Sequence, residues 1–289
     1  MRGLGEGGCT ERVRLWNCLH EHSSLGSFLP LINVAEASCQ AAFCVPFCAM
    51  LLRLKRRCTP CLALLALLTS CAAPSERAAF ITVASQPANV GDAKISALVY
   101  HDSGDYARDL AEVADRAARW VTKRAAGVSR PALVLDIDET ALSNWEVIKL
   151  DDFGRPIAGP CDPASGAPCG WAAWDQLGRD PAIEPTLQVF RVARAANVTV
   201  FFITGRPEDQ RAATERNLRA VGFGGYARLF MVPNGSHFAS ASDFKAPVRE
   251  QIERQGYTII ANVGDQPSDL MGGHAEKRYL LPDPFYRVP

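Results

Sequence analysis

The chain has 289 residues, of which 48% are hydrophobic and 21% are charged, and its formal net charge is zero. This length allows one globular domain of ordinary size with additional segments. After residue 70 the chain holds 24 basic and 27 acidic residues. This mildly negative balance argues against nucleic-acid binding, which needs a basic face.

The first 70 residues are predicted to lie outside this domain. Arg53–Arg57 is positively charged and Cys61–Leu68 is apolar, a combination typical of a signal peptide. The apolar run is too short to span a bilayer as a helix. It continues into Thr69-Ser70-Cys71, which together with Leu68 is similar to a bacterial lipobox, in which the cysteine carries lipid.

The first 70 residues also predict where the protein resides. Because Met50 lies just before the basic segment, we interpret residues 50–70 as a lipoprotein signal peptide and residues 1–49 as a mis-assigned, disordered upstream extension. A genuine cysteine-rich domain there is the alternative, although no paired Cys-x-x-Cys spacing supports it. Residues 71–91 would tether an exported protein to the membrane through lipid on Cys71. Alanine after that cysteine, in place of aspartate, favours the outer membrane, facing the periplasm.

Residues 92–289 are predicted to form the globular domain, which starts with a helical extension. Apolar residues recur at near-helical spacing from Asp92 to about Ala126. The segment Asp102-Ser103-Gly104 is expected to divide this region into a short and a long helix, with Asp102 or Ser103 as the N-cap of the second.

A short apolar strand, Ala132–Leu135, then ends on two carboxylates, Asp136 and Asp138. A continuous apolar run is typical of a strand covered on both faces, as in a parallel α/β sheet. In such sheets ligands bind beyond the carboxyl ends of the strands. Two acids at that place are costly unless a cation meets them, which indicates a metal ion or phosphate chemistry. Capping of the following turn is the alternative for this Asp-x-Asp pair.

Two cysteines lie in a loop region after this strand. Of ten cysteines, only Cys161 and Cys169 follow Cys71, and they flank a segment rich in turn-forming residues. Because disulfides persist in exported proteins, we expect a small loop disulfide; two free thiols are the alternative. A zinc site is not expected, because no histidine pair accompanies these cysteines.

Further strand–helix units follow. Strands are predicted at 198–204, 228–232 and 258–263, and helices at 211–220 and 247–255, the latter opened by Asp243-Phe244-Lys245. The first of these strands ends on Thr204-Gly205-Arg206, where a hydroxyl and a backbone N–H can bind a phosphate oxygen. Taken alone this is a weak signal, because any such turn favours Thr and Gly. The last strand runs directly into Asp265 and Asp269.

Together these strand ends carry the groups that phosphoryl transfer through an aspartyl-phosphate needs. Asp136 would be the nucleophile, and Asp138 would protonate the leaving alkoxide and then activate water. The transferring phosphate would be bound by Thr204, Gly205, Arg206 and Lys245. A magnesium ion would be held by oxygens of Asp136, Asp138 (through its carbonyl), Asp265 and Asp269.

In order and spacing, these motifs are similar to the four signature motifs of the haloacid dehalogenase (HAD) superfamily. More narrowly, Asp136–Trp145 and Ala261–Leu270 resemble subfamily IIIB, the class C acid phosphatases, which are exported bacterial enzymes related to plant acid phosphatases and vegetative storage proteins. The resemblance covers roughly residues 91–289. It implies a Rossmann-like α/β core with a mostly parallel sheet flanked by helices, dependence on Mg²⁺, and hydrolysis of phosphomonoesters, nucleoside monophosphates among them.

The sequence departs from the family in two places. Pro267 stands where an aromatic residue is frequent, and residues 151–170 form a more elaborate segment than a minimal family loop. This segment lies in a cap insertion that we expect at about 141–196. The aromatic residues there that could stack on a leaving group are Trp145, Phe153, Trp171 and Trp174. Packing of the cap on the core is the alternative role for the last two.

The expected function is therefore a lipid-anchored, Mg²⁺-dependent acid phosphatase, with 5′-nucleotidase activity as a finer expectation. A catalytically silent storage or binding protein and a phosphotransferase that uses alcohol acceptors are the alternatives. The expected partners are a small phosphomonoester and a membrane, without a nucleic-acid polymer, and formation of a homo-oligomer stays open.

Overall fold

The computed structural model describes residues 87–288. The predictions for the upstream extension, the signal peptide, Cys71 and most of the tether therefore lie outside the described residues. Within the described part of the chain, no helix has the length and apolar character needed to cross a bilayer.

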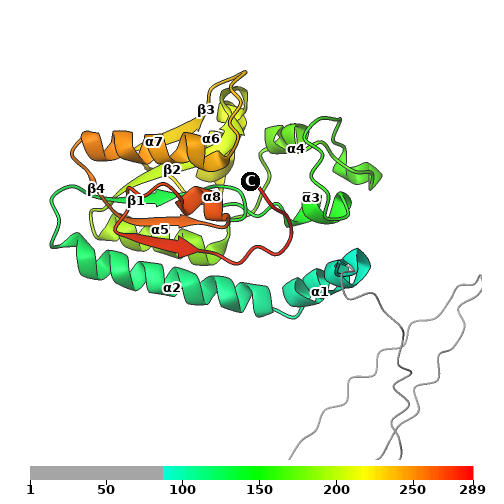
Figure 1. Cartoon of the computed structure of the whole chain (residues 1–289), viewed down its shortest axis with the longest axis horizontal. Coiled ribbons are helices and arrows are strands. Elements are labelled where there is room, and N and C mark those ends of the chain that lie inside the picture. The colour runs from blue at the N-terminus through cyan, green and yellow to red at the C-terminus, as the bar shows by residue number, and fades with distance from the viewer. Residues whose placement is uncertain (1–86, 289) are drawn as a thin grey trace, which may run out of the picture. The chain divides into compact units, whose positions relative to one another are not determined.

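A five-stranded parallel sheet forms the centre of the fold (Figure 1). Its strands are β1 (Pro131–Leu135), β2 (Thr199–Pro207), β3 (Arg228–Val232), β4 (Thr258–Gly264) and β5 (Lys277–Leu280). The order across the sheet is β3-β2-β1-β4-β5, and every neighbouring pair is parallel. The chain thus builds outward from β1 on one side and then crosses to β4 on the other, which makes the β1–β4 boundary the point where ligands bind in such sheets. The predicted α/β class is confirmed.

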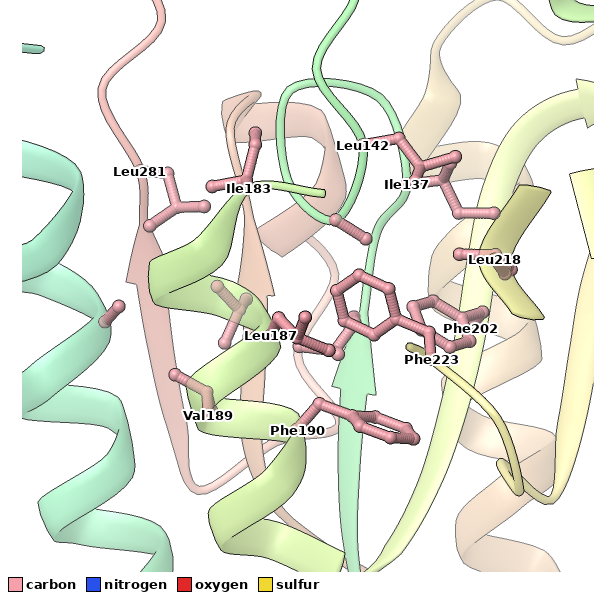
Figure 2. Packing of buried hydrophobic residues seen from close by; sticks show 14 of the residues in the cluster. Ile137, Leu142, Ile183, Leu187, Val189, Phe190, Phe202, Leu218, Phe223 and Leu281 are labelled. Atoms are coloured by element: carbon pink, nitrogen blue, oxygen red, sulfur yellow. The ribbon is translucent and has the colours of Figure 1, made fainter. Parts of the chain in front are cut away.

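Both faces of the sheet are covered by helices, because its strands are apolar on both sides. Leu133, Leu135 and Phe202 belong to one hydrophobic cluster, whereas Ala132 and Val134 belong to another. The first cluster packs beneath α2 (Asp105–Ala125) and α5 (Glu184–Ala195), as Figure 2 shows for α5, and the second packs against α7 (Ala241–Arg254). Successive side chains of β1 thus pack into clusters on opposite faces of the sheet, so the strand is held between two layers of helices.

The helical extension consists of α1 (Val90–Asp102) and α2, and the predicted break is present. The N-cap predicted for the second helix, Asp102 or Ser103, was wrong, however. The N-cap of α2 is Gly104, with φ 85°. A glycine adopts this left-handed conformation without steric cost. The hydroxyl of Ser103 instead accepts a hydrogen bond from the backbone N–H of Asp105 at 3.3 Å.

The region predicted as a cap divides into two parts. The helices α3 (Trp145–Leu150) and α4 (Trp171–Leu177), with a short 3-10 helix (Pro163–Ser165), lie beside the sheet (Figure 1). By contrast, α5 is amphipathic and packs on α2 and β2, so it belongs to the helical layer that covers the sheet. The part that stands apart from the sheet therefore ends before α5, earlier than residue 196. We call residues 141–183 the cap.

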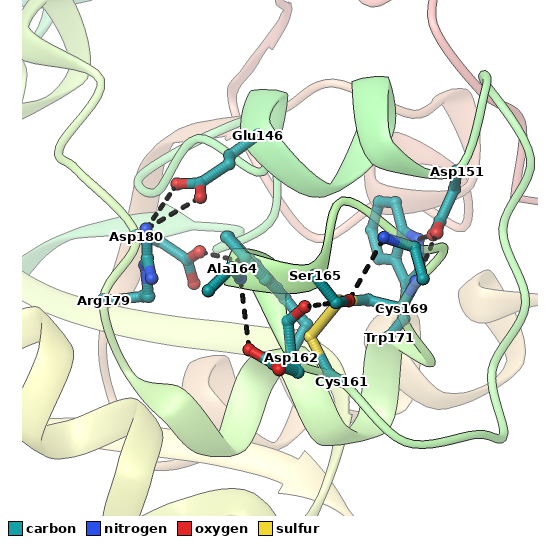
Figure 3. Close-up of a disulfide and its surroundings, with 12 residues drawn as sticks. Glu146, Asp151, Cys161, Asp162, Ala164, Ser165, Cys169, Trp171, Arg179 and Asp180 are labelled. Atoms are coloured by element: carbon teal, nitrogen blue, oxygen red, sulfur yellow. Dashed lines mark hydrogen bonds and ion pairs between the residues drawn. A yellow bond between two sulfur atoms is a disulfide. The ribbon is translucent and has the colours of Figure 1, made fainter.

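A disulfide joins Cys161 and Cys169 in the cap, as predicted (Figure 3). Next to it, the buried carboxylate of Asp151 accepts hydrogen bonds from the backbone N–H of Cys169 at 2.7 Å and from the indole N–H of Trp171 at 2.9 Å. The covalent link and these two bonds tie the start of α4 to the end of α3. The cap loop is thereby closed on itself.

The remaining helices are α6 (Arg211–Ala220), α7 and α8 (Pro267–Leu270), with a 3-10 turn at Glu208–Gln210 before α6. Helix α7 begins at Ala241, six residues before the predicted start, because Ser240 and Asp243 form a capping box. Pro247 lies inside this helix. As a result Lys245 sits on a regular helical turn rather than in a loop.

Candidate active site

The predicted acidic residues meet at the carboxyl ends of the three central strands. Asp136 follows β1, Thr204 lies near the end of β2, and Asp265 follows β4. Because these strands are adjacent and parallel, residues separated by more than a hundred positions in the sequence lie at one edge of the sheet. The convergence of Asp136 and Asp265 that a shared metal ion requires is therefore present.

Three carboxylates form what we call the lysine cluster, together with Lys245. Oxygens of Asp136, Asp265 and Asp269 lie within 4.8 Å of one another, and all three residues are buried. The ammonium group of Lys245 donates to Asp136 Oδ1 at 2.5 Å and to Asp269 Oδ1 at 2.6 Å. One ammonium group faces three carboxylates, so the cluster fits a divalent cation with a preference for oxygen ligands.

Neighbouring groups fix the orientation of these carboxylates. The hydroxyl of Thr140 donates to Asp265 Oδ1 at 3.1 Å, and the side-chain amide of Gln266 donates to Asp265 Oδ2 at 2.7 Å. The backbone N–H of Gln266 donates to Asp269 Oδ2 at 2.9 Å. The oxygens of the cluster are therefore held in place by the protein itself.

Burial changes the protonation of this cluster. Burial raises the pKa of Asp136 to about 7, although the charge of Lys245 opposes the change. The pKa of Asp265 lies well above its usual value, because the group is buried and close to the charges of Asp269 and Asp136. Both shifts have the same main cause, which is burial away from water, and the charges of neighbouring carboxylates add to it.

Asp138 lies in a different environment from Asp136. Arg206 donates to Asp138 Oδ1 through Nη2 at 2.7 Å and Nε at 3.1 Å, and Asn144 donates to the same oxygen at 2.9 Å. The second oxygen, Oδ2, has one contact, 3.3 Å from Nε of Arg206. Burial would raise the pKa of this carboxyl, but the charge and hydrogen bonds of Arg206 and Asn144 lower it below the usual value.

Arg206 is the centre of a second group, the arginine cluster, formed with Asp138, Asp175 and Asp180. Its Nη2 lies 3.3 Å from Asp175 Oδ1 and 3.2 Å from Asp180 Oδ2, both of which belong to the cap. Its Nε and Nη2 groups are thus engaged by protein carboxylates, whereas its Nη1 is buried without a hydrogen-bond partner. A role of Arg206 in binding the transferring phosphate stays a prediction. Asp175 and Asp180 were missed by the sequence reasoning, because no motif marks them.

Thr204 and Gly205 lie beside these clusters. Thr204 is fully buried, and its hydroxyl accepts the backbone N–H of Arg206 at 3.1 Å. Gly205 lines the cleft described below, and a Cβ at this position would have no atom within 4 Å. The backbone near the end of β2 is therefore open to a ligand at Gly205, while the Thr204 hydroxyl holds the backbone of Arg206.

Both clusters open into one cleft of about 360 Å³. Its floor includes Asp136, Asp138, Lys245, Asp265 and Asp269. The cap contributes a wall with Arg155, Ile157 and Trp171. The segment between β3 and α7 contributes the facing wall with His237 and Phe238, and α7 adds Phe244. The tail after β5 contributes Tyr286 and Val288. This volume suits a small ligand.

The four aromatic residues of the cap differ in role. Trp171 lines the cleft. Trp174 is buried and donates its indole N–H to Asp180 at 2.7 Å. It therefore packs within the protein, the alternative to stacking on a leaving group. Trp145 stacks on His101 with ring centroids 3.7 Å apart, and Phe153 packs against Trp145, so neither ring lies in the cleft wall.

The tail contributes residues for which the sequence assigned no role. The hydroxyl of Tyr286 donates to Glu139 Oε2 at 3.1 Å, and the backbone N–H of Val288 donates to Gln266 Oε1 at 3.2 Å. Asp283 accepts from the same Gln266 side chain at 2.7 Å. The tail thus completes the wall next to the lysine cluster.

A parallel α/β domain with an acidic, lysine-bearing site at the carboxyl ends of its central strands, covered by a small cap, defines a protein of the HAD class. The comparison of sequences agrees with this assignment and narrows it. Residues 67–289 match the family described as HAD superfamily, subfamily IIIB (acid phosphatase), and the chain belongs to that family.

Three plant relatives are 28% to 30% identical to this chain over the aligned residues. The chain is 28% identical over 185 residues to acid phosphatase 1 of Solanum lycopersicum, covering 63% of this chain and 69% of that protein. It is 30% identical over 162 residues to the stem 28 kDa glycoprotein of Glycine max, covering 55% of this chain and 61% of that protein. Vegetative storage protein 1 of Arabidopsis thaliana is 28% identical over 157 residues, with 54% and 55% covered.

Among solved structures, the fold is similar to the class C acid phosphatase from Bacillus anthracis. The TM-score is 0.54 at 18% identity, and the match covers 68% of this chain and 85% of that one. At this level of identity the likeness supports the fold.

Proposed function

We propose that the protein is a Mg²⁺-dependent acid phosphatase that hydrolyses phosphomonoesters through an aspartyl-phosphate, with nucleoside 5′-monophosphates among its candidate substrates. The observation that carries this proposal is the lysine cluster. Three buried carboxylates and one lysine converge at the floor of a cleft of ligand size. Family membership supports the reaction class.

The lysine cluster supplies the nucleophile and the positive charge. A Mg²⁺ ion would be held by Asp136, Asp265, Asp269 and the backbone carbonyl of Asp138, and would supply neutralisation of the phosphate charge. Lys245 binds the transferring oxygens and reduces the repulsion between Asp136 and the phosphate. In the absence of substrate this lysine is held by Asp136 and Asp269.

In the first step, a carboxylate oxygen of Asp136 attacks phosphorus and the bond between phosphorus and the leaving oxygen breaks. The leaving alkoxide takes a proton from Asp138, which must therefore carry a proton in the substrate complex; the negative charge of the bound phosphate favours that proton and opposes the lowering of the pKa by Arg206 and Asn144. We assign this proton to Oδ2, because Arg206 and Asn144 concentrate their hydrogen bonds on Oδ1. In the second step, Asp138 accepts a proton from water, which attacks phosphorus, releases inorganic phosphate and regenerates the Asp136 carboxylate.

The test is hydrolysis of para-nitrophenyl phosphate by the full-length chain, before and after removal of metal with EDTA and after addition of Mg²⁺. We expect turnover that EDTA abolishes and Mg²⁺ restores. An absence of turnover in all three conditions would favour the silent storage or binding alternative, although pairing of Asp136 with Lys245 argues against it. Addition of an alcohol acceptor separates hydrolysis from phosphotransfer, because only transfer yields a new phosphomonoester.

We also propose that the protein is exported and lipid-anchored through Cys71, on the support of the lipobox in its sequence. Cys71→Ser should move the protein from the membrane fraction to the soluble fraction. Retention of this variant in the membrane fraction would contradict the anchor.

A further inference from the structure

Three cationic side chains, Lys245, Arg206 and Arg155, line the cleft. Two of them are already engaged: Lys245 pairs with Asp136 and Asp269, and Arg206 pairs with the three carboxylates of its cluster. Arg155 makes no ion pair within 4.0 Å to any carboxylate of residues 87–288. Of these three cations, it is the one whose charge a ligand can use without breaking a protein ion pair.

Arg155 is also held in place by a preformed surface. Its guanidinium carbon lies 4.8 Å from the ring centroid of Trp171 and 5.5 Å from that of Tyr286. Both rings are themselves fixed, since Trp171 donates to Asp151 at 2.9 Å and Tyr286 donates to Glu139 at 3.1 Å. A guanidinium held against aromatic faces keeps its N–H groups in its own plane available for a carboxylate or phosphate.

The position of Arg155 corresponds to the leaving-group side of the cleft. Arg155 lines the cleft from the cap, the same part of the chain from which Asp175 reaches Arg206, and Arg206 in turn pairs with Asp138. Asp138 is the group that protonates the leaving oxygen in the proposed mechanism, whereas the transferring phosphate lies at Asp136 and Lys245. A ligand group that reaches Arg155 is therefore part of the leaving group.

We propose that Arg155 binds a second anionic group on the substrate, so that the preferred substrates are phosphomonoesters whose leaving group carries a carboxylate or another phosphate. This inference rests on the proposed phosphatase function and narrows its substrate class. The acidic floor would repel such a leaving group unless a cation met it, and Arg155 supplies that cation. An uncharged flat leaving group would instead have to displace the guanidinium from the faces of Trp171 and Tyr286.

The size of the cleft agrees with a compact substrate. Its volume of about 360 Å³ lies at the lower end of the range for small-molecule sites. Ile157 and Phe238, which are 52% and 44% exposed, line the cleft from the cap and from the facing wall. A short carbon chain between the two anionic groups would contact these apolar side chains.

The experiment compares matched substrates on the full-length, Mg²⁺-loaded protein. One pair is 3-phosphoglycerate and glycerol 3-phosphate, which differ by a carboxylate in place of a hydroxymethyl group. The other is fructose 1,6-bisphosphate and fructose 6-phosphate, which tests a second phosphate. We expect kcat/KM to be about tenfold or more higher for the doubly anionic member of at least one pair, the size of effect that one charge-assisted bidentate contact supplies.

Arg155→Gln should reduce that ratio to about one while leaving the singly anionic substrates within about threefold of the unmodified protein. Arg155→Lys should retain part of the preference, since it keeps the charge but loses the planar fork. The matched control is Arg228→Gln, which removes another ring-stacked arginine, 4.6 Å from the Phe230 centroid and outside the cleft lining. It should leave both ratios unchanged.

Two results would overturn the inference. One is a preference that persists in Arg155→Gln, or that is absent from the unmodified protein. The other is an equal loss for all substrates, which would place Arg155 on the transferring phosphate. If the unmodified protein hydrolyses no substrate at all, the proposed function fails, and calorimetric binding of 3-phosphoglycerate and glycerol 3-phosphate to it and to Arg155→Gln still decides whether Arg155 binds the second anion.

Discussion

The lysine cluster and the arginine cluster have the same formal composition, one cation and three aspartates, but they handle their excess negative charge differently. In the lysine cluster the three carboxylates come from the ends of core strands and their turns, and their oxygens converge within 4.8 Å. In the arginine cluster the guanidinium lies between one carboxylate of the core and two of the cap. The first arrangement leaves room for a metal ion at the centre; in the second, the arginine fills that place.

In the arginine cluster, burial works against ionisation of the two cap carboxyls. It raises the pKa of Asp175 to about 7 and also raises that of Asp180, although the charge of Arg206 opposes both shifts. Asp138 makes the shortest contact with Arg206, at 2.7 Å, whereas Asp175 Oδ1, 3.3 Å from Nη2, has no hydrogen bond. The comparison indicates that one cluster is built to bind and react, and the other to hold the acid/base group.

The largest effect is expected from Asp136→Asn. The amide cannot attack phosphorus, so kcat should fall by more than a hundredfold while the fold is retained. The measurement is para-nitrophenyl phosphate turnover, with circular dichroism as the control for folding. Residual activity above about 1% would argue against Asp136 as the nucleophile.

Arg206→Gln should lower kcat by about a hundredfold, a typical contribution of a positioned acid/base group, because Asp138 loses the donors that orient it. KM should change less, since Arg206 is occupied by protein carboxylates. Arg206→Lys should recover part of kcat but not all, because an ammonium group keeps the charge but lacks the planar fork that places Nε and Nη2 together on Asp138. If KM rises and kcat is unaffected, Arg206 binds substrate and the distinction between the clusters fails.

The stability of the metal-free protein should depend on pH through the lysine cluster. A carboxyl whose pKa is raised on folding binds more protons in the folded state, so its contribution is complete below about pH 4 and is lost as the pH rises through about 7, the pKa of Asp136. The free energy of unfolding should therefore fall by a few kcal/mol over that range, by the order of magnitude that such a shift implies. Urea denaturation at pH 5 and pH 7.5 measures this.

Addition of Mg²⁺ at pH 7.5 should reverse the loss, because the ion stabilises the ionised carboxylates. Asp265→Asn should reduce both the pH dependence and the response to Mg²⁺. A metal-free protein that is more stable at pH 7.5 than at pH 5 would contradict the assigned cause.

The smallest effect is expected from the double substitution Cys161→Ser and Cys169→Ser. Removing a bridge over a loop of this length should cost about 2 kcal/mol in the chain-entropy description, as measured by urea denaturation. Because the bridge lies in the cap, kcat should decline through the arginine cluster, while Mg²⁺ affinity at the lysine cluster stays the same. A change confined to Mg²⁺ affinity would mean that the two clusters are not separable in this way.

The sequence was sufficient to predict the aspartates of the lysine cluster because they follow two clearly apolar strands, whereas Lys245 lies within α7 and was assigned from its motif. The run Ala132–Leu135 has one reasonable structure, and the position of Asp136 at the sheet edge follows from it. By contrast, β5 was missed, because Lys277 and Arg278 are exposed on an edge strand, where apolar patterning is weak. Edge strands in general carry such charges.

The arginine cluster could not be predicted in the same way. Asp175 lies on α4 and Asp180 in the turn after it, and the sequence of this region resembles any capped helix end. That their carboxylates reach Arg206 depends on how the cap rests on β2, which is a tertiary contact without a local pattern. The phosphate-binding role predicted for Arg206 from its motif therefore left out its contacts with the cap.

The tail beyond β5 ties the reacting groups to the edge of the sheet. β5 is an outermost strand, and the residues that follow it hold Glu139 and Gln266 through Tyr286 and Val288. Undocking of this segment would expose the lysine cluster to bulk water without removing any of its carboxylates. A substitution that loosens the edge strand would therefore lower turnover without touching a reacting group.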